Sequence, residues 1–167
     1  MGINERQLIE LMNSYGHYLK QTAFHSLHDL QLAEDMVQET FISFYTKGQF
    51  MYKASPKTYL YRILMNHIKM YLRKNKIKTI SEDCIYESSE SVDIEAYTIN
   101  KMDLSYGLAA LDDKYRHVIV LYHLNDLSID EISKILNCNK STVKMRLKRG
   151  REKLKILLGA GYEKSEY

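Results

Sequence analysis

The chain has few of the residues that break helices or form turns: its 167 residues include only 1 Pro and 7 Gly. An all-β sandwich or barrel needs turn residues at many short intervals, so this shortage excludes such folds and indicates an all-α protein. The sequence also lacks the run of roughly 18 to 20 apolar residues that spans a membrane. Its N-terminal segment carries Glu5, Arg6 and Glu10, where a signal peptide would be apolar. We therefore expect a cytoplasmic protein.

Motifs for metal binding and catalysis are also missing. The 2 cysteines, Cys84 and Cys138, form no CxxC pair, so we expect free thiols. His25 and His28 belong to no HExxH motif, which favours a surface or capping role, and His67 is expected to be a hydrogen-bonded core residue. No GxxxxGK[ST], GxGxxG or GxSxG motif occurs. We therefore predict no enzymatic activity, no catalytic residue, no metal, no cofactor and no small-molecule substrate.

Charge is distributed unevenly along the chain. Residues 1–80 hold 11 Lys and Arg against 6 Asp and Glu, residues 81–100 hold 6 acidic and no basic residues, and residues 101–167 hold 13 basic against 9 acidic residues. Two basic blocks around a short acidic block indicate two surfaces for anionic partners and a linker between them. Four Ser within residues 81–91 also favour a linker there.

Two amphipathic helices are predicted in the first basic block. Asn4 and Gln7 have the spacing of a capping box, which predicts a helix over residues 5–26. A second helix should follow from Asp29, with its core face formed by Ala33, Val37, Thr40, Phe41 and Phe44. The opposite face holds an apolar side chain among hydrogen-bond acceptors, which suits either docking to another helical surface or simple solvation. These residues are Asp35, Gln38, Glu39 and Ile42.

A third helix is predicted over residues 57–75, after a loop that contains Pro56 and the aromatic residues Phe50 and Tyr52. Its apolar face comprises Leu60, Ile63, Leu64, His67, Ile68 and Tyr71. Opposite lies a stripe that combines basic, amide and aromatic side chains, namely Tyr59, Arg62, Asn66, Lys69, Met70 and Arg73. Cations that contact phosphates, next to rings that stack on bases, indicate single-stranded nucleic acid as the ligand; the alternative is a solvated basic face.

The second basic block contains a predicted helix-turn-helix. Ser128 and Glu131 form a capping box that opens a helix over residues 129–136, and Asn139 can cap a second helix after a turn of about three residues. Val143, Leu147, Gly150 and Leu154 should form the buried face of this second helix, while Ser141, Lys144, Met145 and Lys148 form its outer face. A basic outer face favours binding in the major groove of duplex DNA, although two ordinary core helices would be the alternative.

These segments, taken together, resemble a bacterial RNA polymerase sigma factor of the extracytoplasmic-function (ECF) group. The resemblance to sigma region 2 lies in AEDMVQETF at residues 33–41 and in YLYRILMNHIKMYLRK at residues 59–74. The resemblance to sigma region 4 lies in residues 127–154. The family commonly has Trp at the position of Tyr59, Asp at Met70, Gly at Asn137 and Ala at Gly150.

The resemblance implies three binding surfaces. Asp35, Gln38, Glu39 and Ile42 would dock on a coiled coil of the polymerase clamp. The -10 element would be melted and captured by Tyr52, Lys53, Ala54, Ser55, Tyr59, Arg62, Asn66, Lys69 and Arg73. The -35 element would be read as duplex by Lys140, Ser141, Thr142, Lys144, Met145, Lys148 and Arg149. Expected partners are core RNA polymerase (clamp coiled coil and flap), promoter DNA and an anti-sigma factor.

The expected organisation is two small helical domains joined by a flexible acidic linker. Residues 1–76 form region 2, residues 77–99 the linker, residues 100–160 the helix-turn-helix region 4, and residues 161–167 a C-terminal tail. The alternative is a stand-alone helix-turn-helix transcriptional regulator that binds duplex DNA by itself. The aromatic and basic first block favours the sigma factor, because it suits unpaired bases.

Overall fold

The structure is a computed structural model that describes residues 4–46, 55–81 and 99–158. Every regular element in these ranges is helical, which confirms the all-α prediction. Three of the predicted -10 residues, Tyr52, Lys53 and Ala54, lie outside the described ranges, as do Cys84 and most of the predicted linker. The flexibility of the linker, the end of region 2 at residue 76 and the start of region 4 at residue 100 therefore stay predictions.

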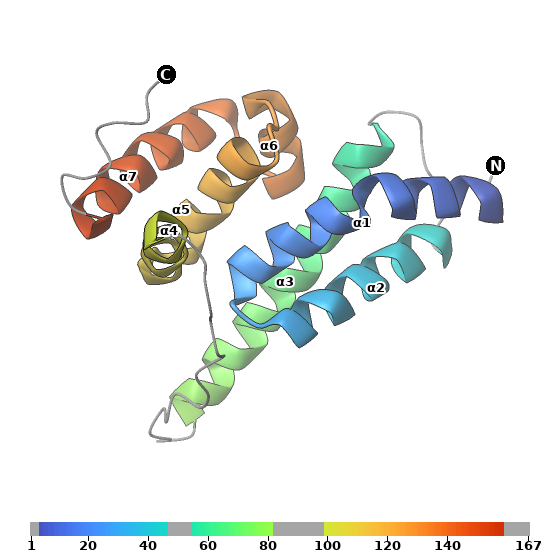
Figure 1. Ribbon diagram of the computed structural model, residues 1–167, viewed down its shortest axis with the longest axis horizontal. Coiled ribbons are helices and arrows are strands. Elements are labelled where there is room, and N and C mark those ends of the chain that lie inside the picture. Colours follow the sequence, from blue (N-terminus) through green and yellow to red (C-terminus); the bar gives the residue numbers. More distant parts are fainter. Residues whose placement is uncertain (1–3, 47–54, 82–98, 159–167) are drawn as a thin grey trace.

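The N-terminal half consists of three helices, α1 (Glu5–Leu27), α2 (Leu30–Thr46) and α3 (Pro56–Ser81) (Figure 1). The predicted capping box of α1 is present: the Asn4 side chain accepts a hydrogen bond from the Gln7 amide, and the Gln7 side chain accepts one from the Asn4 amide. His28 ends the helix in the left-handed region at φ 56°, and its N–H donates to the Phe24 carbonyl, so the expected capping role of His28 is confirmed. α2 then folds back along α1, and α3 packs on both.

The C-terminal half contains α4 (Ile99–Ala110), α5 (Asp113–Ile119), the π-helical segment η1 (Val120–Leu124), α6 (Ile129–Leu136) and α7 (Lys140–Leu158) (Figure 1). The predicted capping box of α6 forms between Ser128 and Glu131. All four residues predicted for the buried face of α7 are buried, namely Val143, Leu147, Gly150 and Leu154. The helix-turn-helix is therefore confirmed in both its helices and its facing.

Gly150 lies where α7 packs closely on α5. A Cβ added there would come within 3.0 Å of Ile119 Cδ1 and 3.3 Å of the Tyr115 Cβ. A Gly in a helix interior costs about 0.5 to 1 kcal/mol against Ala. The structure adds a compensation, because the missing side chain lets the two helices approach.

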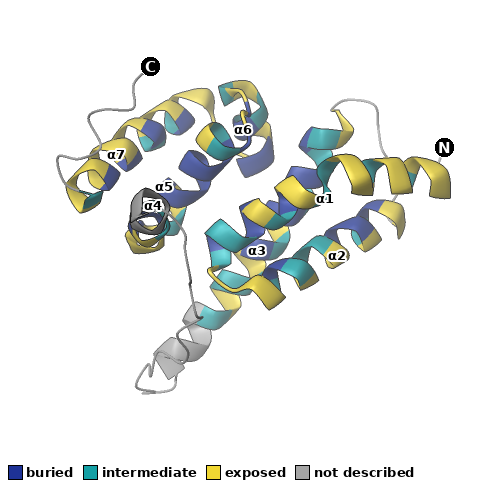
Figure 2. Ribbon diagram, viewed as in Figure 1, coloured by how far each residue is buried: buried dark blue, intermediate teal, exposed yellow. Residues whose placement is uncertain are grey.

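The two halves pack against each other through a common core. One continuous cluster of buried apolar residues runs from Leu19 in α1 and Leu64 in α3 to Leu121 in η1 and Leu147 in α7. α3 contacts α6, and α1 contacts η1, α4 and α5. The buried sides of these helices face one another while their outer sides remain exposed (Figure 2). The helix-turn-helix therefore sits directly on the helix that carries the predicted -10 stripe.

Candidate nucleic-acid interface

Helix α7 presents its predicted DNA-binding residues to solvent. The Asn139 side chain caps the helix by accepting a hydrogen bond of 2.7 Å from the Thr142 amide. Because Val143 and the three other buried residues anchor one side of the helix, the opposite side is free to face a groove. Six predicted residues are exposed and Thr142 is half-buried: the exposed ones are Lys140, Ser141, Lys144, Met145, Lys148 and Arg149.

The turn between α6 and α7 depends on Asn137. This residue adopts φ 52° and ψ 52°, the left-handed conformation that Gly or Asn accepts most readily at a helix C-terminus. The amides of Asn137 and Cys138 both donate to the Ser133 carbonyl, which closes α6. Asn137 therefore adopts the left-handed conformation at a position where the family that this sequence resembles commonly has Gly.

An ion pair links the starts of the two helix-turn-helix helices. Lys140 Nζ lies 2.5 Å from Asp130 Oδ1, and both side chains are exposed. The hydrogen bond from Lys140 lowers the pKa of Asp130, and the charges of Lys140, Lys134 and Lys144 lower it further. Lys140 is thus partly neutralised by Asp130, whereas no ion pair is recorded for Lys144 or Lys148 among the described residues. Of the predicted -35 residues, Lys144 and Lys148 therefore keep their full positive charge on the exposed side of α7.

The predicted -10 stripe follows one side of α3. Arg62, Asn66, Lys69 and Arg73 are all exposed. Tyr59 is half-buried, with its ring 5.6 Å from that of Phe44, so only part of its face is available for stacking. The remaining described residue of the set, Ser55, is the cap of the helix: its Oγ accepts a hydrogen bond of 3.1 Å from the Thr58 amide.

The predicted polymerase-binding residues form one exposed row on α2. Asp35, Gln38, Glu39 and Ile42 are all exposed, and Ile42 shows 55% of its surface. The other side of α2 is buried through Ala33, Thr40, Phe41 and Phe44. Together with the half-buried Val37, these are the residues expected to face the core. An apolar side chain surrounded by acceptors, on a helix anchored from behind, provides a surface that another helix can bind.

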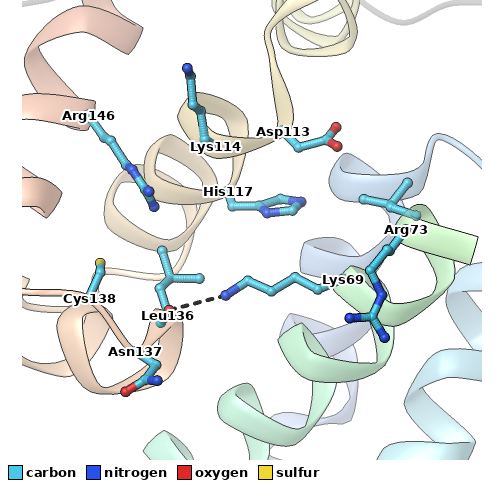
Figure 3. A pocket seen from close by; sticks show the side chains of 10 residues that line it. Lys69, Arg73, Asp113, Lys114, His117, Leu136, Asn137, Cys138 and Arg146 are labelled. Atoms are coloured by element: carbon cyan, nitrogen blue, oxygen red, sulfur yellow. Dashed lines mark hydrogen bonds between the residues drawn. The ribbon is translucent and has the colours of Figure 1, made fainter. Parts of the chain in front are cut away.

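The -10 stripe touches the helix-turn-helix at Lys69. Its ammonium donates a hydrogen bond of 3.2 Å to the Leu136 carbonyl, at the C-terminal end of α6 (Figure 3). A cation is favoured at this end of a helix, because the last carbonyl groups point outward there. Burial lowers the pKa of Lys69, and the nearby charge of Arg146 lowers it further. Lys69 therefore joins the two predicted DNA-binding elements to each other.

Sequence reasoning missed a buried polar junction between the two halves. The Tyr61 hydroxyl donates to Asn125 Oδ1 at 2.9 Å, and Asn125 Nδ2 donates to Thr22 Oγ1 at 2.8 Å. Tyr61 and Thr22 each have 1% of their surface exposed, and Asn125 has 6%. Burial raises the pKa of the Tyr61 hydroxyl, so it remains a donor. A signal existed in the sequence: Tyr61 and Met65 form a second apolar face of α3, four residues apart, beside the predicted one.

Arg116 is a further residue of this junction that the sequence did not predict. Its guanidinium donates to the Ser26 carbonyl of α1 at 3.0 Å and to the carbonyls of Leu108, Ala109 and Leu111, at the end of α4, at 2.6 to 3.1 Å. An ion pair of 3.4 Å with Asp113 balances part of its charge. Burial lowers the pKa of Arg116, while Asp113 and Asp112 oppose this shift. The buried Arg116 side chain thus donates hydrogen bonds to carbonyl groups at the C-terminal ends of two helices, α1 from one half and α4 from the other.

The described residues contain no group of three or more His, Cys, Asp or Glu placed to hold a metal ion. Within the same ranges, no helix combines the length and apolar character needed to cross a membrane. Cys138 is a free, half-buried thiol. His67 Nε2 lies 3.4 Å from Ser43 Oγ, as expected for a hydrogen-bonded residue, but His67 is half-buried on α3 and is not part of the core as predicted.

Comparisons with known proteins match the two halves of the chain to two family models. Residues 11–77 match the family described as Sigma-70 region 2, and residues 102–154 match Sigma-70 region 4. The chain is 33% identical to the ECF RNA polymerase sigma factor SigM of Bacillus subtilis over 136 residues, which cover 80% of this chain and 83% of SigM. It is 32% identical to SigW of the same organism over 166 residues, covering 87% of this chain and 86% of SigW.

Two solved structures share the fold. The sigma factor RpoE in complex with the anti-sigma factor NepR from Bartonella quintana has a TM-score of 0.76 at 23% identity, covering 94% of this chain and 97% of that chain. CnrH in complex with the cytosolic domain of CnrY has a TM-score of 0.70 at 23% identity, covering 93% of this chain and 89% of that chain. These likenesses extend over both halves of the described chain.

Proposed function

Because the chain belongs to the ECF RNA polymerase sigma factors, we propose that it binds core RNA polymerase and directs transcription initiation at promoters that carry a -10 and a -35 element. The observation that supports this most directly is the presence, in one chain, of three exposed surfaces of different chemistry on three separate helices. α2 offers acceptors around Ile42, α3 a basic and amide stripe, and α7 a basic outer face. The protein would itself catalyse no reaction, since RNA synthesis belongs to the polymerase.

The α7 surface suits duplex DNA. Lys144 and Lys148 lie on the exposed side of a helix whose N-terminal part projects from the turn at Asn137. Lys at such a position reaches either guanine acceptors in the major groove or backbone phosphates. We assign this helix to the -35 element, with Lys140, Ser141, Thr142, Met145 and Arg149 completing the contact surface.

The α3 surface suits unpaired bases near position -10. Asn66 supplies both a donor and an acceptor to a base edge, and Arg62 and Arg73 supply charge for phosphates. Tyr59 has part of its ring available for stacking. The α2 surface has no nucleic-acid character, because Asp35 and Glu39 would repel phosphates; we assign it to the polymerase clamp.

The two halves must separate before both elements are bound. The -10 and -35 elements lie about 25 base pairs apart, or roughly 80 Å along B-form DNA. In this structure α3 packs directly on α6, and Lys69 is bonded to the carbonyl of Leu136. α7 has 19 residues, which gives it a length of only about 28 Å. We infer that the described arrangement is a closed state and that promoter binding requires an open one.

The decisive experiment is run-off transcription with core polymerase over a genomic promoter library, followed by two variants on one responsive promoter. Lys144→Ala should weaken promoter binding by about 1 to 3 kcal/mol if it reads a base, or lower the salt dependence by about one unit if it holds a phosphate. Asn66→Ala should leave duplex binding nearly intact and abolish permanganate reactivity of thymines near -10. Lys134→Ala on α6 and Asn13→Ala on α1, both at exposed positions, are the matched controls.

A stand-alone helix-turn-helix regulator is the competing function. Such a protein shifts duplex DNA without polymerase and does so as a dimer at spaced half-sites. If the isolated chain shifts promoter duplex alone, and if Asn66→Ala leaves the permanganate pattern unchanged, this alternative replaces the sigma assignment. Dependence of the shift on core polymerase supports the assignment.

A further inference from the structure

A cavity of about 490 Å³ opens between the two halves, beside the contact of α3 with the helix-turn-helix (Figure 3). Its basic lining residues are Lys69 and Arg73 from α3, Lys114 from α5 and Arg146 from α7. Asp113 is the only carboxylate among the described residues that line it. The lining therefore carries a clear excess of positive charge.

Among the described residues that line the cavity, one carboxylate faces four basic side chains. That carboxylate, Asp113, also forms an ion pair of 3.4 Å with Arg116. Burial is the main cause that lowers the pKa of the Lys69 ammonium; Cys138 opposes this shift, and the charge of Arg146 adds to it. Like charges gathered in a partly enclosed space repel each other more strongly than they would on an open surface. An anionic ligand would remove this repulsion.

We propose that the cavity binds a small anion that carries two or more phosphate groups. The volume lies within the roughly 300 to 1,000 Å³ of small-molecule sites. Arg146 can form paired hydrogen bonds to phosphate oxygens, and the Lys69 ammonium extends toward the same space from α3 (Figure 3). The charged ends of Arg73 and Lys114 point away from that space and add positive charge at its rim. A single orthophosphate would use only part of this set, whereas a diphosphate group reaches cations from both halves.

The apolar lining residues of the cavity provide a way to distinguish two sources of such an anion. Leu72, Leu136 and Cys138 provide an apolar side to the cavity. A nucleoside diphosphate would place its base or sugar against them, while inorganic pyrophosphate would leave them uncovered. The shared chemistry is the diphosphate group, and the two sources differ in whether the apolar side adds affinity.

The site is complete only in the closed state, because its cations come from α3, α5 and α7. A ligand that binds only this state stabilises it by mass action. It also occupies Lys69, which the proposed function assigns to the -10 element, so a regulatory effect of the ligand rests on that function. Binding of the anion does not depend on the proposed function, because a chain that failed to direct transcription would still bind it.

Calorimetric titration of the full chain with pyrophosphate, ADP and orthophosphate tests the site. Pyrophosphate or ADP should bind, with orthophosphate at least about tenfold weaker. Arg146→Gln should weaken pyrophosphate binding by about tenfold or more, since it removes a charged hydrogen-bond donor from the cavity. Arg149→Gln is the matched control, because it makes the same change on the same helix at an exposed position that does not line the cavity.

Hydrogen exchange locates the ligand. Pyrophosphate should slow exchange both in α3 around Lys69 and in the turn at residues 136–138, since the cavity joins these segments. ADP binding more tightly than pyrophosphate would identify a nucleotide source, and equal affinities would identify the diphosphate group alone. The proposal is wrong if neither ligand binds at millimolar concentration, if orthophosphate binds as tightly as pyrophosphate, or if Arg149→Gln weakens binding as much as Arg146→Gln.

Discussion

The buried junction between the two halves can be tested through the hydrogen bond from Tyr61 to Asn125. Asn125→Ala removes the acceptor of the Tyr61 hydroxyl and the donor that reaches Thr22 Oγ1 and the Val120 carbonyl. The Thr22 hydroxyl keeps its own bond to the Tyr18 carbonyl, at 2.9 Å. A buried hydroxyl left without its partner costs about 1 to 3 kcal/mol, and a lost neutral hydrogen bond costs about 1 kcal/mol. We therefore expect Asn125→Ala to lower the free energy of unfolding by about 2 to 4 kcal/mol.

A double-mutant cycle isolates the bond across the junction. Tyr61→Phe alone should cost about 1 kcal/mol, because it removes the donor together with the group that needs an acceptor. In the Tyr61→Phe background, Asn125→Ala should cost less than in the native chain, by a coupling energy of about 1 to 2 kcal/mol. Tyr45→Phe, which changes a hydroxyl on a residue with 49% exposure, is the control and should leave stability unchanged.

Urea unfolding followed by circular dichroism measures all four free energies, and equal slopes across the variants validate the comparison. A coupling energy within about 0.3 kcal/mol of zero would refute the reasoning, because that is the range expected of distant, independent sites. Such a result would mean that the halves are apart in the free protein and that both side chains are hydrated.

Two further predictions concern the polymerase-binding row and the pH dependence of stability. Replacing Gln38 and Glu39 with Ala should weaken binding to core polymerase, measured by fluorescence anisotropy, and should leave the helical circular dichroism spectrum unchanged. The control Gln31→Ala, on the same helix, should bind normally. Unchanged affinity of the double variant would mean that the row is a solvated face. Burial, with Arg116 and His25 nearby, lowers the pKa of His28 to about 4 from its ordinary value near 6.5. The unfolded chain then binds the proton more tightly, so stability should fall as pH drops from about 6.5 to about 4, the interval between the unfolded and folded pKa of His28. The loss should be no more than about 1 kcal/mol, because the ring is partly buried but much of the residue is exposed to solvent. His28→Asn, which keeps a residue suited to φ 56°, should flatten the pH profile of the urea midpoint, and an unchanged profile would contradict the assignment.

Local sequence features were sufficient to predict α1, α2, α3, α6 and α7, whereas α4, α5 and η1 were not predicted. A helix cap needs only a few neighbouring residues, so the boxes at Asn4 and Ser128 could be found by spacing alone. The buried face of α7 follows from one period of apolar residues. Met12 is an exception to the helical apolar pattern of α1, since it has 46% of its surface exposed. It lies near the start of the helix, where fewer neighbours are available to cover it.

The arrangement of the two halves could not be predicted, because the contacts that determine it are far apart in the sequence. Tyr61 and Asn125 are separated by 64 positions, and Arg116 and Ser26 by 90. A single buried polar residue leaves no periodic pattern in the sequence from which its partner could be predicted. Arg116 in particular looked like one more cation of a basic block, whereas its guanidinium donates four hydrogen bonds to carbonyl groups from both halves.

Under the proposed function, in which Lys69 contacts the -10 element, closure and promoter binding compete for its ammonium, and this sets the sign of a last prediction. Its ammonium bonds to the Leu136 carbonyl in the closed state, so the same group is unavailable to DNA until the halves separate. Binding of a ligand to the open state is weakened by the free energy needed to reach that state. Asn125→Ala lowers this cost, so promoter complexes with core polymerase should form at a lower protein concentration, by up to about tenfold per 1.4 kcal/mol of lost closure. Run-off transcription at limiting protein measures this, and a loss of transcription in proportion to the lost stability would show that Asn125 supports the fold of α6 and α7 without holding the halves together.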